Sequence, residues 1–411
     1  MDDDVRRVVI VGASLGGASV AAALRERDFA GEVMLIGEEL LRPYERPSLS
    51  KSYLARQDET PTFVHDEDYY DDHDIRLDLG VTVTAIDRAS RTVQLAGGGS
   101  EPYDRLVLAT GSRPRRLAVR GADLEGVVTL HTAGDSDRMR ERARAAGNAV
   151  VVGAGWIGCE VAASLRQSGV EITLIDPLEA PLARVLGAEV GHHFAELHRA
   201  HGVDLRMGTG VTEILGSGDA AGVRLDTGDV LETELVVVGI GATPRIELAE
   251  AAGLDLRLGG VRTDARLRTS DPAIYAIGDI AAMYHPLYGT EVRVEHWANA
   301  KDQGAYLAGS ILGDAEDYAR PPFFYSDQYD LGMEYRGWVD PSVPAEVVLR
   351  GKPGEGGGGW FAFWLQDGRV QAGMNVNEWD DGDAIERLVT VRPRLDAARL
   401  ASLDVPLSEM V

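Results

Sequence analysis

Two apolar runs, each followed by a glycine-rich turn, mark repeated strand–turn–helix units along the chain. The first run covers residues 8–11 and leads through glycines into a helical pattern that ends near Leu24, with a second strand at 33–36. The same order returns over residues 148–176. A buried strand, a tight turn, a helix and a second buried strand form the βαβ unit that binds dinucleotides. The pattern therefore predicts an α/β protein with two such folds.

The pattern changes near residue 320. Strand-like segments at 347–349 and 360–365 are separated by glycine-rich or Asp-Gly turns, and residues 384–389 have a helical pattern. Short strands joined by such turns are typical of antiparallel sheets. We therefore expect a C-terminal α+β domain after the two Rossmann-type folds.

Charge and composition exclude several classes of function. The 411 residues include 41 basic and 66 acidic ones, a net charge of −25, which disfavours nucleic acid and anionic membranes as partners. No apolar stretch reaches the ~18 residues of a membrane span, and residues 1–4 are acidic where a secretory signal is basic. The single cysteine, Cys159, cannot form an intrachain disulfide. These features predict a cytoplasmic protein.

The second glycine motif is complete. Gly153, Gly155 and Gly158 have the spacing that allows a tight turn, close approach of a pyrophosphate and close helix–strand packing. Asp176 ends the next strand, where a carboxylate would accept hydrogen bonds from ribose hydroxyls. Because residues 177–179 contain no arginine for a 2′-phosphate, the motif predicts NADH rather than NADPH.

The first glycine motif is imperfect, because Ser14 stands between Gly12 and Gly17 where the middle glycine would be. The serine hydroxyl could bond a phosphate, although an ordinary turn would also fit. Glu38, with Glu39 as the alternative, ends the second strand and could hold the ribose of FAD; a solvated loop acid is the other interpretation.

Two further segments favour a flavin. Residues 103–114 read as a buried strand that opens into a turn at Thr110 and Gly111, and residues 273–279 form a short strand ending in Gly-Asp. In a flavoprotein the Asp279 carboxylate would accept a hydrogen bond from a ribityl hydroxyl. Alone, the Gly-Asp pair is a common turn.

The order of these segments resembles the pyridine nucleotide–disulfide oxidoreductase superfamily. Within it, the chain is similar to the putidaredoxin reductase-like family, the NADH-dependent ferredoxin reductases that serve oxygenases. The similarity runs from about residue 8 to about residue 331 and weakens toward residue 388. The matching segments are residues 42–51, 153–160, 278–279, 293–304 and 325–328.

The resemblance implies a glutathione reductase-like arrangement of domains and two cofactors. An FAD domain would comprise residues 1–113 and 243–317, an NADH domain 114–242, and a C-terminal interface domain 318–411. FAD would bind non-covalently, since no flavin-linking Cys or His motif is present. Hydride would pass from NADH to FAD, and single electrons would go to a ferredoxin that feeds a P450 or a Rieske oxygenase. A 2Fe–2S ferredoxin is expected, with other cluster types open.

The resemblance also assigns roles to individual residues. Lys51 and Glu160 match a Lys–Glu pair beside the flavin on its nicotinamide side, where an ammonium stabilises negative charge on the reduced ring. The segment Glu295-His296-Trp297 matches backbone at the pyrimidine edge of the flavin. The remaining expected cofactor-binding residues on this basis are Arg46, Thr110 and Gly111.

Three positions depart from the family pattern. Ser48 replaces a frequent proline, Tyr325 a common tryptophan near the ring, and Glu334 a frequent Gln or Lys. These departures affect the expected identity of the electron acceptor more than they affect the expected flavin chemistry.

Two absences narrow the chemistry further. Residues 41–51 lack the CxxxxC pair of disulfide reductases, and Cys159 is expected to be a packing residue, so electrons would leave directly from the flavin. The nine histidines show no metal-ligand spacing. Other acceptors stay open, namely rubredoxin, monodehydroascorbate or oxygen, as does a redox-responsive binding protein resembling apoptosis-inducing factor. The sequence leaves the oligomeric state undefined.

Overall fold

A computed structural model of the chain describes residues 5–55, 60–313, 316–354 and 358–411, so the acidic residues 1–4 lie outside it. The chain forms two compact units. Unit 1 consists of Met1–Glu45, Thr62–Arg113 and Thr243–Pro322, and unit 2 of Arg46–Pro61, Pro114–Ala242 and Phe323–Val411. The segment Arg46–Pro61, which includes Lys51, thus belongs to unit 2. The three-domain division expected from the sequence stays a prediction.

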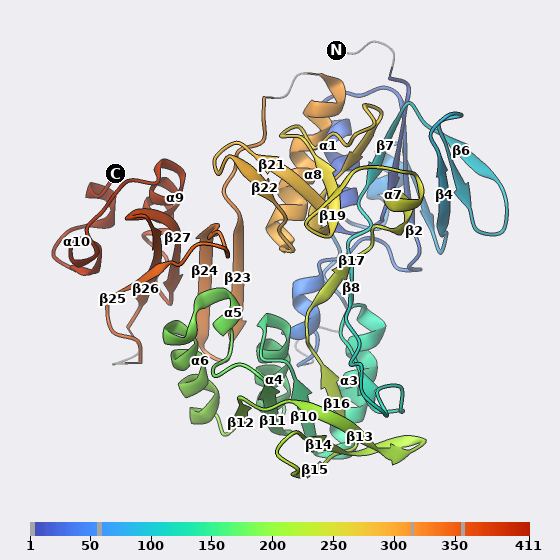
Figure 1. Cartoon of the computed structure of the whole chain (residues 1–411). Coiled ribbons are helices and arrows are strands. Elements are labelled where there is room, and N and C mark those ends of the chain that lie inside the picture. Colours follow the sequence, from blue (N-terminus) through green and yellow to red (C-terminus); the bar gives the residue numbers. More distant parts are fainter. Residues whose placement is uncertain (1–4, 56–59, 314–315, 355–357) are drawn as a thin grey trace. The chain divides into compact units, whose positions relative to one another are not determined.

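Unit 1 is built on a five-stranded parallel sheet (Figure 1). The strand order is β20-β7-β1-β2-β3, and the strands are β1 (Arg7–Val11), β2 (Glu32–Gly37), β3 (Ile75–Leu79), β7 (Arg105–Leu108) and β20 (Ile274–Ala276). Val8 and Ile10 belong to one hydrophobic core, and Val9 and Val11 to another. The sheet is buried on both faces, which explains the continuous apolar runs in the sequence.

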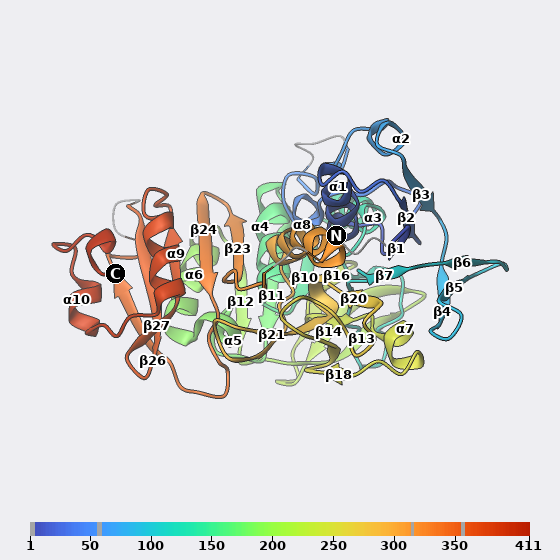
Figure 2. The same ribbon diagram turned by 90° about the horizontal axis from the view of Figure 1, so that it is seen from above.

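Helices α1 (Leu15–Glu26) and α8 (Trp297–Leu312) lie side by side against one face of this sheet (Figures 1 and 2). The two helices approach closely where Gly304 faces Gly16: a Cβ on Gly304 would lie only 2.6 Å from the carbonyl oxygen of Gly16. The remaining elements of unit 1 are α2 (Tyr69–Asp72), β4 (Val83–Asp87), β5 (Thr92–Leu95), β6 (Ser100–Pro102), α7 (Glu247–Ala251), β18 (Leu256–Arg257), β19 (Gly260–Thr263), η2 (Gly278–Ile280), β21 (Ala281–His285) and β22 (Thr290–Val292).

Unit 2 contains a second five-stranded parallel sheet, of order β12-β11-β10-β16-β9. Its helix α3 begins with a capping box between Thr132 and Asp135 and ends at Gly147 in the left-handed conformation. The elements of this part are η1 (Arg46–Ser50), β9 (Val127–Val128), α3 (Ala133–Ala146), β10 (Asn148–Val152), α4 (Trp156–Gln167), β11 (Glu171–Asp176), α5 (Ala183–Leu186), α6 (Ala188–Ala200), β12 (Asp204–Met207), β13 (Val211–Ser217), β14 (Asp219–Leu225), β15 (Val230–Glu232) and β16 (Val236–Val238). Both predicted βαβ units are therefore confirmed.

The C-terminal part of unit 2 is an antiparallel sheet of order β23-β24-β27-β26-β25. Its elements are β23 (Phe323–Gln328), β24 (Leu331–Gly337), β25 (Glu346–Arg350), β26 (Trp360–Gln366), β27 (Arg369–Val376), α9 (Gly382–Val391), α10 (Ala397–Ala401) and η3 (Leu407–Glu409). Trp364 belongs to the large core of unit 2, whereas Phe363 packs with α9, so β26 is buried on both faces. The predicted C-terminal α+β architecture is confirmed.

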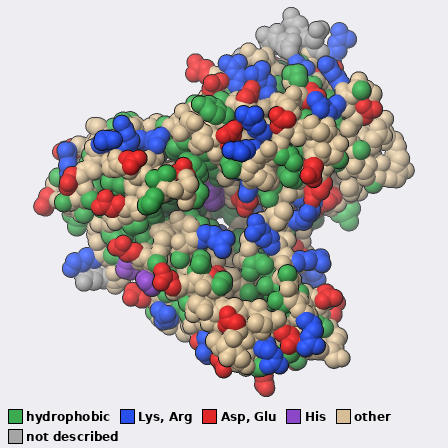
Figure 3. Space-filling view, in the orientation of Figure 1, with side chains coloured by type: hydrophobic (Ala, Val, Ile, Leu, Met, Phe, Trp, Pro, Cys, Tyr) green, Lys and Arg blue, Asp and Glu red, His purple; other side chains and the backbone are tan. Residues whose placement is uncertain are grey.

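Two short strands, β8 (Ser112–Pro114) and β17 (Ala242–Pro244), pair where the chain leaves unit 1 and returns to it. On the face shown in Figure 3, acidic and basic side chains are interspersed. No helix in the described part of the chain has the length and apolar character needed to cross a membrane.

Candidate functional site

The first glycine turn connects β1 to α1 in unit 1. Gly12 has a φ of +122°, and a Cβ on it would lie 2.1 Å from the carbonyl oxygen of Ala109; a Cβ on Gly17 would lie 2.1 Å from the carbonyl oxygen of Gly12. The fold itself therefore requires both glycines. Ser14 is the N-cap residue of α1, but its side chain makes no capping hydrogen bond, and the first turn carries no acidic residue. The positive end of the helix dipole is thus open to a phosphate.

The second glycine turn connects β10 to α4 in unit 2. Two of its glycines are required by the fold, and the third leaves space open beside the backbone. Gly153 has a φ of +104°, and a Cβ on Gly158 would lie 1.8 Å from the carbonyl oxygen of Gly153. At Gly155 the φ is −79° and no atom lies within 4 Å of the Cβ position. The protein therefore does not need a glycine at Gly155 for its own packing. The open space fits a pyrophosphate that approaches the backbone closely.

Asp176 ends β11 next to this turn. Its Oδ2 accepts a hydrogen bond from the Ala154 amide at 2.8 Å, and its Oδ1 accepts one from the Leu178 amide at 2.8 Å. The carboxylate therefore holds the glycine turn in place, and each oxygen retains a lone pair for a ribose hydroxyl. The predicted ribose contact stays a prediction.

Arg245, which sequence reasoning did not select, connects several predicted residues of unit 1. Its guanidinium forms an ion pair with Glu38. Its carbonyl oxygen accepts a hydrogen bond from Thr110 Oγ1 at 2.6 Å, and its amide donates to the carbonyl of Gly111 at 2.8 Å. Glu39, the alternative ribose-binding acid, accepts a hydrogen bond from a tyrosine hydroxyl. The signal that could have found Arg245 is its place just after residue 243, where the FAD domain was expected to resume.

Arg293 similarly connects two predicted residues at the start of α8. Its guanidinium donates to the carbonyl oxygen of Asp279 at 3.1 Å and forms an ion pair with Glu295. His296 is the N-cap residue of α8, and Trp297 is its first residue, with the ammonium of a lysine 4.9 Å from its ring centroid. Burial lowers the pKa of His296 to about 4, so this imidazole is neutral at physiological pH.

In unit 2 the structure brings Lys51 and Glu160 together. Lys51 Nζ lies 3.0 Å from Glu160 Oε1, with 17% of the lysine side chain and 5% of the glutamate side chain exposed. Two hydroxyl groups also donate to the same carboxylate, Ser50 Oγ at 2.5 Å from Oε2 and Ser326 Oγ at 2.8 Å from Oε1. The buried carboxylate is thus satisfied by one cation and two hydroxyls, as a buried charge requires.

The segment that carries Lys51 is anchored to the helices of unit 2. Arg46 donates to the carbonyl oxygen of His131. Ser136 Oγ, on α3, donates to the carbonyl of Leu49 at 3.0 Å, and an α4 serine hydroxyl donates to the carbonyl of Ser50 at 2.6 Å. These bonds explain why the segment groups with unit 2 rather than with unit 1.

Strand β23 lies next to the Lys51–Glu160 pair, and its buried and more exposed residues alternate. Ser326 is fully buried, whereas its neighbours Tyr325 and Asp327 are more exposed. Desolvation raises the pKa of the Asp327 carboxyl group, and the positive charge of Lys51 opposes this shift. Glu334, which lies opposite Tyr325 on β24, accepts a hydrogen bond from the guanidinium of an arginine two residues later on that strand, at 2.9 Å.

Ser50 and Ser326 are functional candidates that sequence reasoning missed. Alternation along residues 323–328 places position 326 among the buried ones, and a serine at a buried strand position requires a partner. That combination was the available signal.

The lone cysteine is a core residue. Cys159 is fully buried within the main core of unit 2, and burial raises the pKa of its thiol. A thiol in this state is a poor nucleophile. Among the described residues, no group of three or more His, Cys, Asp or Glu side chains is placed to hold a metal ion.

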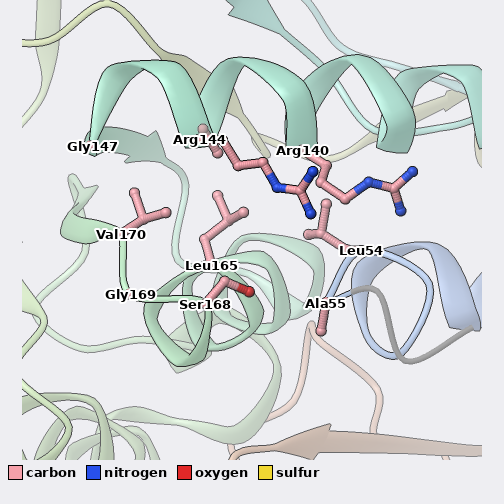
Figure 4. A pocket seen from close by; sticks show the side chains of 10 residues that line it. Leu54, Ala55, Arg140, Arg144, Gly147, Leu165, Ser168, Gly169 and Val170 are labelled. Atoms are coloured by element: carbon pink, nitrogen blue, oxygen red, sulfur yellow. The ribbon is translucent and has the colours of Figure 1, made fainter.

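A pocket of about 410 Å³ in unit 2 lies beyond the end of α4 opposite its glycine turn (Figure 4). Arg140 and Arg144 line it from α3, and Leu54 and Leu165 form part of its apolar wall. Both α3 and α4 end here, and cationic side chains are favourable beside helix C-termini. None of the predicted site residues lines this pocket.

Comparison with known proteins gives consistent results. The family model described as "Pyridine nucleotide-disulphide oxidoreductase" matches residues 6–304, and a second model, "Reductase C-terminal", matches residues 323–411. The chain is 40% identical over 405 residues to the ferredoxin–NAD(+) reductase component of the anthranilate 1,2-dioxygenase system of Burkholderia cepacia, covering 97% of this chain and 98% of that protein. It is 38% identical over 402 residues to rhodocoxin reductase of Rhodococcus erythropolis, covering 97% and 93%.

A solved structure shares the whole fold. The covalent putidaredoxin reductase–putidaredoxin complex superposes with a TM-score of 0.92 at 35% identity, covering 98% of each chain. With its two glycine turns, its paired Lys51 and Glu160 and its C-terminal sheet, this chain belongs to the pyridine nucleotide-disulphide oxidoreductase family, in the putidaredoxin reductase-like group of ferredoxin reductases.

Proposed function

We propose that this protein is an FAD-dependent NADH:ferredoxin oxidoreductase that supplies electrons to a P450 or Rieske oxygenase. The observation that carries the proposal is the buried Lys51–Glu160 pair, with Nζ and Oε1 3.0 Å apart, in a chain whose single cysteine is fully buried. The pair offers a cation for charge that develops on a reduced ring, and no dithiol competes for the electrons. Relatives named as ferredoxin reductases support the same acceptor class.

Residues of unit 1 would hold FAD. The open N-terminus of α1, with Gly12, Ser14 and Gly17, would bind its pyrophosphate, and Glu38 its ribose. Asp279 would bond the ribityl chain. The other proposed contacts in unit 1 are Thr110, Gly111, Glu295, His296 and Trp297, while Arg46 and Lys51, to which the resemblance also assigns flavin contacts, belong to unit 2. When bound, the flavin accepts a hydride and returns electrons one at a time.

Residues of unit 2 would hold NADH. Gly153, Gly155 and Gly158 would admit its pyrophosphate at the N-terminus of α4. Asp176 would accept hydrogen bonds from the adenosine ribose and repel a 2′-phosphate. The lysine ammonium is held in place by the glutamate, so its charge is already oriented before the nucleotide arrives.

We also propose that the protein works in the cytoplasm. The substrate NADH is a cytoplasmic pool metabolite, and a chain with a single cysteine is suited to a reducing compartment.

The decisive experiment is steady-state oxidation of NADH by the purified yellow protein against a panel of acceptors. The panel contains 2Fe–2S, 3Fe–4S and 4Fe–4S ferredoxins, with cytochrome c as the reporter. We expect turnover to depend on a ferredoxin, with a 2Fe–2S protein preferred. Equal turnover with and without every ferredoxin, or folded protein that cannot be reconstituted with FAD, would overturn the proposal.

A further inference from the structure

A chain of hydrogen bonds extends inward from the Lys51–Glu160 pair. Gln328 Nε2 donates to Ser326 Oγ at 3.3 Å, and Gln328 Oε1 lies 3.0 Å from His198 Nε2. The hydroxyl of Tyr329 lies 3.3 Å from His198 Nδ1. Ser326, Gln328 and His198 are 0%, 1% and 0% exposed. Helix α6 is thus connected through β23 to the carboxylate on α4.

The chemistry of these groups fixes the direction of every bond. A carboxylate only accepts, so Ser326 must donate to Glu160. The serine oxygen then accepts from the amide nitrogen of Gln328, which turns the amide oxygen toward His198. Because that oxygen also only accepts, His198 carries its proton on Nε2, and its Nδ1 accepts from the tyrosine hydroxyl. Each donor points toward the carboxylate.

This arrangement requires an uncharged imidazole. A protonated His198 would carry a second proton on Nδ1, so the tyrosine hydroxyl would have to turn and accept from this nitrogen instead of donating to it. Burial lowers the pKa of His198 to about 4, so the ring is neutral and in the required tautomer at physiological pH.

The chain ends on the oxygen that contacts the lysine. Glu160 Oε1 accepts from both Ser326 Oγ and Lys51 Nζ, whereas Oε2 accepts from Ser50. With both oxygens bonded, the carboxylate cannot rotate about its terminal bond without breaking a hydrogen bond. Replacing a buried ion pair with apolar side chains of similar volume is often neutral or stabilising, so core filling alone does not account for this network. All donors of the hydrogen-bond chain point toward Glu160 Oε1, which indicates that the chain acts on this oxygen.

We propose that Ser326, itself held by Gln328 and His198, is a positioning residue that fixes the Glu160 carboxylate against the Lys51 ammonium. The inference deepens the proposed function, because a fixed ammonium is useful only where charge develops next to it. Ser326 is fully buried and acts through Glu160 and Lys51.

The first test observes Lys51 directly and does not depend on turnover. The chain contains only three lysines, Lys51, Lys301 and Lys352, so selective ¹³C,¹⁵N-lysine labelling of the holoprotein gives three side-chain signals. We expect Ser326→Ala to shift the Lys51 signal and to speed the solvent exchange of its ammonium protons. The Lys301 and Lys352 signals should stay in place, and Ser326→Thr, which keeps the hydroxyl, should restore the wild-type signal. An unchanged Lys51 signal in Ser326→Ala would overturn the proposal.

The second test measures reduction of the bound flavin by NADH in a stopped-flow instrument. Ser326→Ala should lower the limiting rate roughly tenfold, the size expected for one hydrogen bond to a charged group, without changing the NADH Kd. In a Glu160→Gln background the same substitution should have no further effect. An equal loss in both backgrounds would show a general structural effect and contradict positioning.

Two further variants guard against a folding artefact. Gln328→Met breaks the chain one step further from the carboxylate and should give a smaller change in the same direction at Lys51. Thr233→Val removes another buried hydroxyl of unit 2, which donates to the carbonyl of Leu235 at 3.0 Å. This control should lower the melting temperature without moving the Lys51 signal. Should the control move it equally, the proposal fails. If wild-type protein does not oxidise NADH, the proposed function fails, while the lysine signals still decide the role of Ser326.

Discussion

The ammonium of Lys51 lies 5.3 Å from the centroid of the Tyr325 ring, and Ser326, the next residue on β23, donates a hydrogen bond to the Glu160 carboxylate that pairs with this ammonium. The same cation therefore contacts a carboxylate and an aromatic face.

We predict that Tyr325→Ala lowers the rate with the cognate iron–sulfur protein but barely changes ferricyanide reduction. Ferricyanide is small and needs no docking surface, whereas a ferredoxin must contact the protein near the site of electron exit. The lost cation–π contact at this partly exposed ring is worth about 0.5 kcal/mol, so the hydride step, which both acceptors require, should slow about twofold at most.

Both rates and the melting temperature should be measured on one preparation, with Tyr325→Phe as the matched control. A parallel fall of ferredoxin rate, ferricyanide rate and melting temperature would assign the ring to packing of the C-terminal sheet instead.

Replacement of Lys51 by Met should slow flavin reduction by roughly 10- to 1,000-fold while FAD stays bound, since the ammonium acts on charge that develops in the transition state. Glu160→Ala should slow it less, because the lysine charge remains. The two side chains are in contact, so their effects should be non-additive. A stopped-flow double-mutant cycle checks this, and strict additivity would refute the functional pairing.

The carboxylate of Asp176 should matter for both nucleotide binding and nucleotide choice. We expect the wild type to prefer NADH over NADPH. Asp176→Ala should weaken NADH binding roughly tenfold, because it removes the acceptor for ribose hydroxyls and also releases the Ala154 amide. It should reduce the preference for NADH as well. Equal reduction rates with both nucleotides in the wild type would contradict the assignment.

Substitutions at two glycines of the second turn should affect NADH binding and folding separately. Gly155→Ala places a methyl group in open space, so the protein should fold with an unchanged melting temperature but bind NADH at least tenfold more weakly. Gly158→Ala pushes a methyl group against the carbonyl of Gly153 and should destabilise unit 2 by several kcal/mol. Thermal unfolding and NADH titration of both variants decide it. Unimpaired NADH binding by Gly155→Ala would show that the open space serves no nucleotide.

Acid should destabilise the protein through His198. Its pKa is lowered to about 4 in the fold and is about 6.5 in an unfolded chain. Between these values the unfolded state binds a proton that the folded state does not, so stability falls as the pH drops from about 6.5 to about 4, by up to about 3 kcal/mol. His198→Asn should show a flatter pH dependence in denaturant titrations. His285 and His296, whose pKa values are also lowered, contribute equally to both proteins.

Local patterns predict local features of this protein well. The apolar runs at 8–11 and 149–152 form most of two central parallel strands, because strands buried on both faces need continuous apolar sequence. The tight turns at Gly12 and Gly153 require a positive φ that glycine adopts readily. Asp176, expected at the end of its strand from the dinucleotide-binding pattern, is the last residue of β11.

Contacts between distant segments could not be derived in the same way. Pairing of Lys51 with Glu160 was expected from family resemblance alone, and spacing carries no information on which strand will donate a hydroxyl. Arg245 accepts a hydrogen bond from Thr110 and pairs with Glu38, although both residues are more than a hundred positions away in the sequence. Residues 46–61 belong to unit 2, and hydrogen bonds connect this segment to α3 and α4. The hydrophobic periodicity of the sequence does not predict such long-range bonds.

The discontinuity of unit 2 has a consequence during synthesis on the ribosome. Ser50 and Glu160 are separated by 110 positions, and Glu160 and Ser326 by a further 166. At a translation rate of ~5–20 residues per second, the Glu160 carboxylate waits roughly 8–30 seconds for its second hydroxyl to emerge. During that interval the nascent chain has both glycine turns but lacks β23, and the apolar surface that this strand covers is accessible to chaperones. Substitutions in β23 should therefore reduce the yield of folded protein in the cell more than they reduce the stability of the finished molecule.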